Sequence, residues 1–307
     1  MRSLSRIEGA SESPAQRAAQ ARRRGQVRRL VRLARQVPRH LILILFGILF
    51  GFPMLWMLSS SLKSQQGLFQ YPPQILPWPL TFDNYTQLFQ YFPVGRFFLN
   101  SLIITTLNVT GTLVSCSMAA YSFSRLRWPG RNKIFALTLA TMMLPTQVTM
   151  VPLYLIFRSF GWVDTWYPLW VPAWFGVAFY IFLMRQFFLS LPSEIEDAAK
   201  VDGAGYVRIF LSIALPLMRP ALITVALFAF MNTWNDFVTP LIYIHSTDKM
   251  PLALGLQFIN STGAYVGQSF WGMLMAGAVC ATLPMVILFL FLQRYFVRGI
   301  VMTGLKG

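Results

Sequence analysis

Long apolar runs alternate along the chain with short segments that hold nearly all of the charged residues. A helix crosses a bilayer with about 20 mostly apolar residues, because each adds about 1.5 Å towards a hydrocarbon core roughly 30 Å thick. Backbone groups in lipid must be hydrogen-bonded within the segment, which favours helices. The pattern therefore predicts an all-α, polytopic membrane protein with six transmembrane helices, over residues 41–62, 97–124, 134–150, 166–187, 217–244 and 270–297.

The basic residues predict how these six spans are oriented. Of 26 Lys and Arg residues, 22 fall in the first 39 residues, in 125–133, in 185–219 and after residue 293. These four regions share one side if there are six spans, and cytoplasmic loops of membrane proteins are enriched in Lys and Arg. We therefore expect a multi-pass protein with both termini in the cytoplasm. The opposite side carries Lys63, Arg96, Arg158 and Lys249.

The same pattern divides the chain into three parts. Residues 1–38 contain ten Arg and form a basic cytoplasmic tail, expected to be mobile. Residues 39–300 form the transmembrane domain, with a cytoplasmic loop at 188–219, and residues 301–307 are a cytoplasmic end. An Arg-rich segment beside an apolar span is typical of contact with anionic lipid, so we expect membrane lipid as a partner and no nucleic acid.

Composition argues against a metal centre and against catalysis. Only 12% of the residues are charged, and the chain has two Cys and two His. Cys116 and Cys280 lie in apolar segments and His40 is far from His245, so we expect neither a disulfide framework nor a metal site. No lysine follows a glycine, so the Gly-Lys-Ser/Thr phosphate-binding motif is missing from the sequence. We expect a non-enzymatic protein without a cofactor of its own.

The predicted cytoplasmic loop contains an unusual acidic segment, SEIEDAAKVDGAGYVRIFLSIALP, at residues 193–216. It holds four of the ten acidic residues of a chain whose formal charge is +16. Ser193 and Glu196 have the spacing of a capping box, which predicts a helix start. Glu196 and Lys200 are an i,i+4 pair, and Gly203 with Gly205 can end the helix.

Small apolar residues lie beside these acids. Ile195, Ala198 and Ala199 are spaced to share one helical face, which would fit closely into a groove on a partner. Carboxylates next to that face could pair with basic residues of the partner. The alternative is a solvated connector whose acids only decorate its surface.

The spacing of this segment resembles a known signature. Permease subunits of ABC importers carry E-A-A, three residues, G, nine residues and then I-x-L-P. Here Ala198-Ala199 are followed by Gly203 and by Ile213 to Pro216, with Asp197 in place of the usual Glu. TWNDFVTPL (233–241) and QRYFVRGIVMTGLKG (293–307) are similar to the carbohydrate branch, and the six-span form resembles the G-type subunit of maltose transporters. The resemblance implies a MetI-like bundle.

The resemblance also implies a function and partners. The chain would form half of a pore for a sugar or oligosaccharide in a bacterial or archaeal cytoplasmic membrane. Its partners would be a second permease subunit in a heterodimer, two cytoplasmic ATPases that bind ATP and magnesium, and an extracytoplasmic solute-binding protein. The helix in the acidic loop would dock on one ATPase, with either Glu196 or Asp197 as the main contact. The predicted docking residues are Glu194, Glu196, Asp197, Ala198, Ala199, Asp202 and Gly203.

A second set of polar residues lies within the predicted spans. Asp236 is the only acid there, and an ionisable group at membrane depth indicates function. It follows Pro220 by 16 residues, about 24 Å of helix rise, which places it near the outer side. In a continuous helix it shares a face with Asn232, Asn235 and Thr239, turned to the pore or the partner subunit. A polar cap or an interhelical hydrogen bond is the alternative. Asn108 and Gln147 are weaker substrate-path candidates, since each such residue is more often a buried hydrogen-bonding group.

Two other classes of transporter compete with this interpretation. A secondary transporter driven by an ion gradient usually carries acids or histidines at mid-membrane as ion relays. This chain has only one acid in its predicted spans, near the outer side, which argues against that class. An ABC permease for a non-sugar solute differs from our prediction only by the branch of the family that it resembles.

Overall fold

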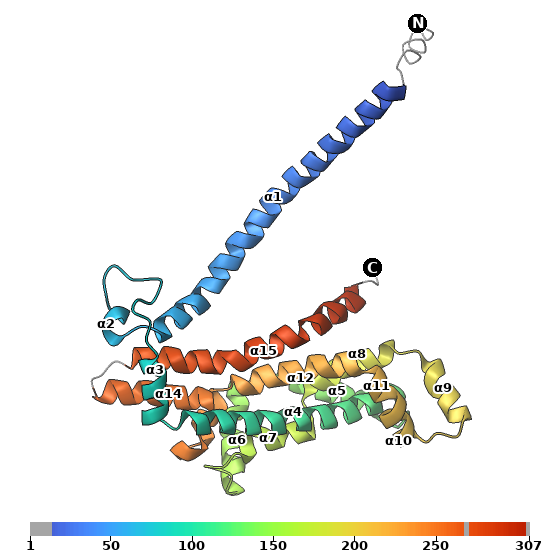
Figure 1. Cartoon of the computed structure of the whole chain (residues 1–307). Helices are drawn as coiled ribbons and strands as arrows, with labels where there is room; N and C mark the ends of the chain where they lie inside the picture. Colours follow the sequence, from blue (N-terminus) through green and yellow to red (C-terminus); the bar gives the residue numbers. More distant parts are fainter. Residues whose placement is uncertain (1–13, 267–269, 305–307) are drawn as a thin grey trace. The chain divides into compact units, whose positions relative to one another are not determined.

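The computed structural model describes residues 14–266 and 270–304, and every regular element in these ranges is helical. The all-α prediction is therefore confirmed. The chain divides into two compact units, Met1–Met57 and Leu58–Gly307. The first unit consists of most of helix α1 (Pro14–Ser61), 48 residues long (Figure 1). The part of the predicted tail at 14–38 is thus helical and runs on into the first span, whereas residues 1–13 lie outside the described residues.

The second unit is a bundle built around one long central helix. Helix α4 (Val94–Arg125) packs against α8, α12 and α14 (Figure 1). The remaining elements, in chain order, are α2 (Gln65–Leu68), α3 (Asp83–Tyr91), α5 (Arg131–Thr141), α6 (Thr146–Ser159), α7 (Tyr167–Trp170), the 3₁₀ turn η2 (Val171–Phe175), α8 (Ala178–Ser190), α9 (Ser193–Val201), α10 (Tyr206–Ile209), the π turn η3 (Phe210–Ala214), α11 (Leu215–Leu217), α12 (Arg219–Trp234), α13 (Val238–Tyr243), the 3₁₀ turn η4 (Thr247–Lys249), α14 (Leu252–Val266) and α15 (Trp271–Gly304).

Four of the six predicted spans are straightforward in the structure. The segments Pro38–Ser61, Val94–Arg125, Tyr167–Ser190 and Trp271–Leu292 are each long and apolar enough to cross a membrane. The third and fifth predicted spans are instead bent pairs of helices. Residues Arg131–Thr141 and Thr146–Ser159 meet at 99°, and Tyr206–Leu217 and Arg219–Trp234 meet at 77°. The described chain therefore has up to six spans, two of them broken.

Prolines explain where the broken spans bend. Pro145 occupies the position just before α6, and Pro220 lies in the first turn of α12. A proline has no N–H to donate and its ring crowds the preceding turn, so it is tolerated at a helix start and not in the interior. The prediction of continuous helices over 134–150 and 217–244 is wrong, because apolar run length registers neither the break before α6 nor the one between α12 and α13.

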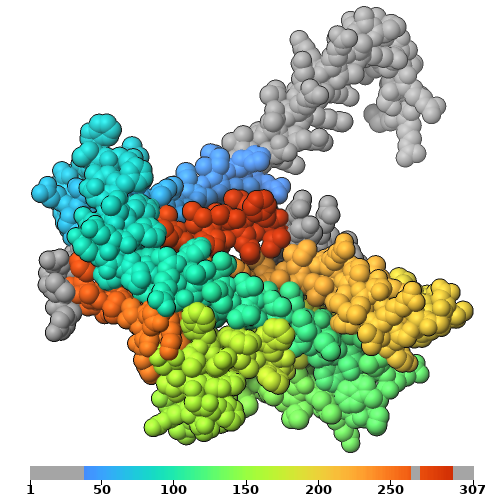
Figure 2. Space-filling model, turned by 60° about the horizontal axis from the view of Figure 1, so that its bottom comes forward, coloured from blue at the N-terminus to red at the C-terminus, as the bar shows by residue number. Residues whose placement is uncertain are grey.

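Two separate hydrophobic cores lie along α4. One contains Cys116, Met184, Phe188 and Ile209 and lies near α8 to α12. The other contains Phe97, which is fully buried and lies so close to α14 that a Cβ on Gly255 would come within 2.2 Å of its ring. Packing at this density transmits displacement, because such interiors have little room to deform. The first core carries α9 and α10, which protrude at one end of the unit in yellow and gold in Figure 2.

Candidate functional site

Helix α9 carries most of the predicted docking residues and its ends explain its length. The residue before the helix is Pro192, in extended backbone, and no side chain caps the first turn. The predicted capping box is therefore wrong, because Ser193 is already the first helical residue. The other end stops as predicted: Gly203 has φ +81° and its N–H donates to Lys200 O at 3.0 Å. This left-handed conformation favours glycine, so the end of α9 is set locally by sequence.

Glu196 is directed into the protein rather than towards a partner. Its Oε1 lies 3.2 Å from Arg125 Nε, and the two side chains are only 9% and 12% exposed. The Nη2 of Arg125 also donates to the carbonyl oxygens of Phe188 at 2.5 Å and Leu191 at 2.6 Å. One guanidinium at the last residue of α4 thus joins α4, the end of α8 and α9. The predicted Glu196–Lys200 pair is not formed, since Glu196 is already engaged with Arg125.

Asp197 is directed outwards from the same helix turn. Its side chain is 66% exposed and its Oδ1 accepts a hydrogen bond from Lys200 Nζ at 2.9 Å. This bond, together with the positive charge of Lys200, holds the pKa of the Asp197 carboxyl below its ordinary value. A partner approaching α9 would therefore meet the carboxylate of Asp197, and not that of Glu196.

The apolar surface of this protrusion differs from the predicted face. Ala199 is buried on the same side as Glu196, whereas Ile195 and Ala198 are exposed. The three residues therefore do not present one docking face. The exposed apolar side chains are mostly further along, at Val201, Tyr206 and Val207, a set that the sequence analysis missed. The sequence signal that could have identified them is their position beside Gly203 and Gly205, because an apolar side chain at a turn has few neighbours to pack against. The predicted docking residues that remain exposed are Glu194, Asp197, Ala198, Asp202 and Gly203.

A cavity of about 480 Å³ lies between α6, the second half of one broken span, and the segment that follows α12 and forms α13. It is lined by Gln147 in the first turn of α6 and by Asp236 between α12 and α13, together with Thr239 and the rings of Phe157 and Tyr243. Non-helical backbone at membrane depth is found where it lines a cavity or is buried in protein. Two of the predicted substrate-path residues, far apart in sequence, thus lie in one cavity wall.

Asp236 does not lie on a continuous helical face. Helix α12 ends at Trp234, and the Asp236 Oδ1 accepts a hydrogen bond from the N–H of Thr239 at 3.1 Å, at the start of α13. The predicted shared face is wrong because Pro240 would collide with the carbonyl group of residue 236 in an unbroken helix. The carboxylate caps α13, which is the alternative that the sequence left open, and it also borders the cavity.

The other polar candidates make hydrogen bonds outside the cavity. Asn232 Nδ2 donates to the hydroxyl of Tyr180 at 2.8 Å, which links α12 to α8. Asn108 Nδ2 donates to the Leu169 carbonyl at 3.0 Å, which links α4 to α7. Asn235 Nδ2 donates to the carbonyl of Met231 at 2.8 Å, one turn back in its own helix. These amides are engaged in packing, and none of them lines the cavity.

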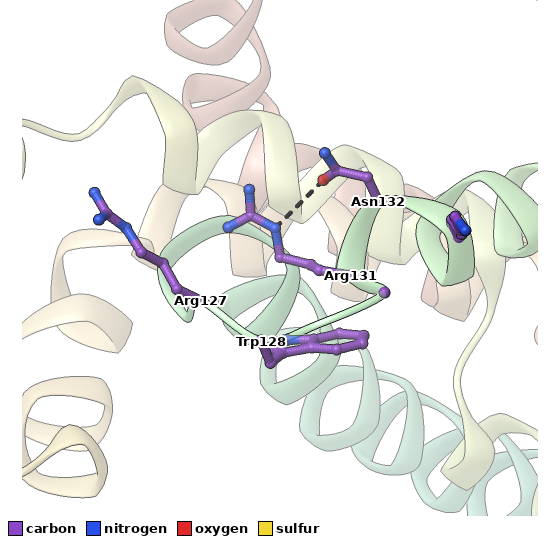
Figure 3. Close-up of a pocket in the computed structure, with 6 residues that line it drawn as sticks. Arg127, Trp128, Arg131 and Asn132 are labelled. Atoms are coloured by element: carbon purple, nitrogen blue, oxygen red, sulfur yellow. Dashed lines mark hydrogen bonds between the residues drawn. The ribbon is translucent and has the colours of Figure 1, made fainter.

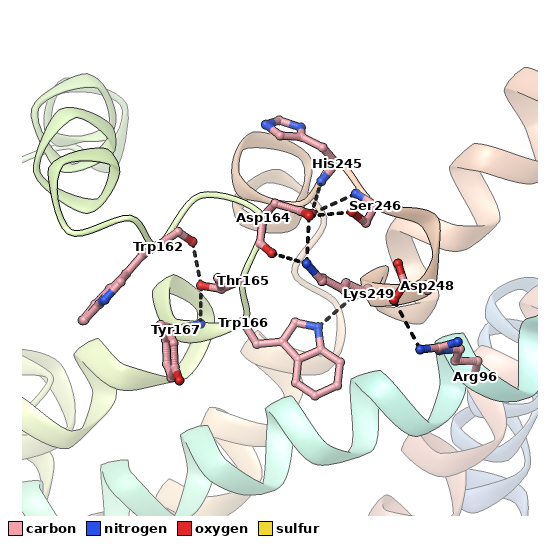
Figure 4. A network of polar contacts seen from close by, with 10 residues as sticks. All are labelled: Arg96, Trp162, Asp164, Thr165, Trp166, Tyr167, His245, Ser246, Asp248 and Lys249. Atoms are coloured by element: carbon pink, nitrogen blue, oxygen red, sulfur yellow. Dashed lines mark hydrogen bonds and ion pairs between the residues drawn. The ribbon is translucent and has the colours of Figure 1, made fainter.

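A polar clasp closes the loops next to this cavity (Figure 4). Asp164, with φ +57°, accepts hydrogen bonds from the N–H groups of His245 at 3.0 Å and Ser246 at 2.9 Å, and from Lys249 Nζ at 2.8 Å. Its own N–H donates to the carbonyl of Tyr243 at 2.7 Å. These donors, the ammonium of Lys249 first among them, hold the pKa of Asp164 far below its ordinary value. The clasp fixes Tyr243, a wall of the cavity, to the loop before α7.

The described residues contain no group of three or more His, Cys, Asp or Glu side chains placed to hold a metal ion. A bundle with broken spans, a cavity beside one of them and a protruding acidic helix is typical of a transport permease. The matching family model, "Binding-protein-dependent transport system inner membrane component", covers residues 111–302. The chain belongs to this family.

Curated relatives and a solved structure agree with that assignment. The chain is 34% identical over 273 residues to the arabinooligosaccharides transport system permease protein AraQ of Bacillus subtilis, covering 87% of this chain and 94% of that protein. It is 32% identical over 278 residues to the maltodextrin transport system permease protein MdxG of the same organism, covering 90% and 98%. A chain of a bacterial ABC transporter involved in alginate import matches with a TM-score of 0.76 and 25% identity, over 85% of this chain and 95% of that one.

These matches confirm the predicted family and the MetI-like permease fold. The protein is a multi-pass membrane permease subunit of an ABC importer, and in such importers a partner ATPase hydrolyses ATP. The chain covers most of the length of its relatives, so the resemblance extends well beyond the signature in the loop after α8.

We predict that Glu196→Gln lowers the stability of the protein while Asp197→Asn does not. Removing one charge of a buried ion pair leaves the other without a counter-charge and costs about 3–5 kcal/mol, whereas an exposed pair contributes well under about 1 kcal/mol. Thermal unfolding of the purified protein in detergent measures both variants. Equal unfolding temperatures for the two would show that the pair of Glu196 with Arg125 is not the support inferred here.

We also predict that the clasp weakens in acid. A carboxyl with a lowered pKa stabilises the folded state above its unfolded pKa, near 3.8, and loses that contribution as the pH falls below it. Asp164→Asn should therefore be less stable than the wild type by about 1–2 kcal/mol at neutral pH, with the gap shrinking below about pH 4. Thermal unfolding at pH 7, 5 and 3.5 measures the gap.

Asp248→Asn is the matched control for the clasp. Its ion pair with Arg96, at 3.3 Å, has both side chains at least half exposed, so about 0.5 kcal/mol or less is expected. A gap for Asp164→Asn that stayed constant across the three pH values would contradict the assignment of the effect to its charge.

Proposed function

We propose that this protein forms half of the pore of an ATP-driven importer for a sugar or oligosaccharide. The relatives AraQ and MdxG are named as permeases for arabinooligosaccharides and maltodextrin, which supports a carbohydrate substrate. A permease of the same fold for a non-sugar solute is the alternative, and one relative, GgtD of Synechocystis sp., is named for osmoprotective compounds. The matching family is named for its dependence on a binding protein, which supports an extracytoplasmic partner that delivers the solute.

The observation that carries the proposal is the opposite orientation of two adjacent carboxylates. Asp197 is exposed on the protruding helix α9, while Glu196 ties that helix to α4 and α8 through Arg125. A surface that offers a carboxylate and apolar side chains can dock in a groove with basic residues. A helix held to two membrane helices by a buried ion pair moves with them, so a displacement at α9 reaches the bundle.

The energy for transport would come from two partner ATPases. ATP and magnesium would bind there, on the cytoplasmic side, and the closing of the ATPases would move α9. Alternating access requires two arrangements of the bundle whose balance the ATPases shift. The excess of basic residues at the α9 end supports a cytoplasmic location for it and for both termini. A second permease subunit would complete the pore as a heterodimer.

The cavity between α6 and α13 would be part of the substrate path. Its amide at Gln147, its carboxylate at Asp236 and the hydroxyl of Thr239 can hydrogen-bond sugar hydroxyl groups, and the rings of Phe157 and Tyr243 offer apolar faces. Asn108, Asn232 and Asn235 would support the fold around the path and not line it.

We predict that Asp197→Lys lowers uptake at least about tenfold and reduces the amount of ATPase that copurifies. Reversing an exposed charge inside a docking surface costs several kcal/mol through repulsion, while the fold keeps its Glu196–Arg125 pair. Uptake of radiolabelled oligosaccharides by cells and subunit ratios in the purified complex measure both effects.

The matched control is Asp83→Lys, because Asp83 is also an exposed helical acid but lies in α3. It should leave ATPase copurification unchanged. Wild-type copurification and uptake for Asp197→Lys would refute docking through this face. Uptake that survived ATP depletion and stopped when the proton and sodium gradients collapsed would favour a secondary transporter instead.

A second prediction concerns the cavity: Gln147→Ala and Asp236→Asn should each lower uptake about fivefold or more without loss of stability. Each removes one hydrogen-bonding or charged group worth about 1–2 kcal/mol to a bound solute, and Asn can still cap α13. Asn235→Ala is the control, since Asn235 neighbours Asp236 and lies outside the cavity. Initial uptake rates at several solute concentrations provide the measurement. Equal losses in all three variants would contradict a role specific to the cavity.

A further inference from the structure

The turn between α4 and α5 contains a basic pocket that the transport function does not use. It has a volume of about 420 Å³ and is lined by consecutive parts of one short segment (Figure 3). Three of its six lining residues are cationic, Arg127, Arg131 and Lys133, and the indole of Trp128 forms one wall. No carboxylate lines it, which makes it a pocket for an anion.

The charges around the pocket are not balanced within the protein. A neighbouring cavity of about 600 Å³ lies between this turn and α9, and its only carboxylates belong to Glu196 and Asp197. Those two are paired with Arg125 and Lys200. Among the described residues, no carboxylate forms an ion pair with the three cations of the pocket. The two cavities together hold three more positive charges than negative ones, although Arg127 still contributes to lowering the pKa of Asp197.

The pocket is held in shape by hydrogen bonds of its own. The Nη1 of Arg131 donates to the Leu126 carbonyl at 2.9 Å, and Trp128 Nε1 donates to the Ser122 hydroxyl at 3.2 Å. Gly130, with φ +85°, turns the chain into helix α5, which is 11 residues long. The unpaired N–H groups of its first turn and the positive end of its dipole therefore lie at this turn. The cations are therefore presented by a fixed turn rather than by a flexible loop.

The surface next to the pocket is apolar. Ile134 and Leu137 follow directly in α5, three residues apart on one face, and are 49% and 67% exposed. Helix α5 is the first half of a broken span, so this face is at membrane depth and Trp128 lies where an interfacial indole is expected. An anion bound in the pocket would thus lie beside an apolar helix surface that leads into the bilayer. A lipid can place its acyl chains on that surface, whereas a free phosphate ion has no apolar part to place there.

We propose that this pocket binds the phosphate headgroup of an anionic membrane lipid, with the acyl chains along Ile134 and Leu137. Basic pockets at the interface attract anionic headgroups with about 1 kcal/mol per Lys or Arg. The site neighbours the Arg125–Glu196 pair, so a bound lipid would brace the turn against which α9 is anchored. This binding does not depend on the identity of the transported solute.

The test compares lipid binding by the purified complex of wild type and Arg127→Gln/Lys133→Gln. Arg131 is left intact because it supports the turn. The probes are phosphatidylglycerol, phosphatidylcholine and inorganic phosphate, and native mass spectrometry counts the molecules bound. The wild type should prefer phosphatidylglycerol over phosphatidylcholine, and the double variant should lose on the order of tenfold in phosphatidylglycerol affinity, with phosphatidylcholine binding unchanged. Inorganic phosphate at millimolar concentration should not displace the lipid.

Arg158→Gln is the control, since Arg158 is an exposed cation in the last turn of α6, outside the pocket. The Arg-rich first 39 residues contribute equally to all three proteins, so the difference isolates the pocket. Phosphatidylglycerol binding by the double variant at the wild-type level overturns the proposal. So does displacement by free phosphate, which would indicate an anion site. A loss of copurifying ATPase with unchanged lipid binding also overturns it, because the cations would then serve a protein partner.

Discussion

The buried ion pair between Arg125 and Glu196 is the interaction on which the proposed mechanism depends. It joins the end of the central helix α4 to α9, and the same guanidinium holds the end of α8 through two carbonyl oxygens. A buried pair is not by itself a strong source of stability, since desolvation offsets much of the attraction. Its main effect here is geometric. Separating two buried charges is costly, so the pair restricts the positions that α9 can take relative to the bundle.

This constraint divides the work between two neighbouring acids. Glu196 maintains the connection to the bundle, and Asp197 remains available at the surface beside Val201. The end with the cavity shows a similar division: Asp164 closes the loops in a clasp, while Asp236 caps α13 and also borders the cavity. In both places, one carboxylate fixes the framework and another stays within reach of a ligand or partner. The basic turn at Arg127 lies beside the first of these anchors, which is why a lipid bound there would bear on the same mechanical connection.

The sequence predicted the class of fold well and the polar details less well. Four spans have the expected helices, because the length of an apolar run is a local property and decides whether a segment can cross the bilayer. Two spans are broken at prolines, and the face assumed for Asn232, Asn235 and Asp236 disappears with the break before Pro240. Of the residues proposed for the substrate path, Gln147 and Asp236 meet in one cavity, while Asn108 and Asn232 serve interhelical hydrogen bonds.

By itself, the sequence determined the membrane class, the number of apolar segments and the family signature, since all three depend on run length and spacing along the chain. It also determined the end of α9 at Gly203, because a positive φ is a local requirement. Only the tertiary structure decided that Glu196 turns inwards and Asp197 outwards, and that Gln147 and Asp236 share a cavity. Adjacent carboxylates look alike in a sequence, and what separates them is a cation on another helix, whose position only the packing of the whole bundle sets.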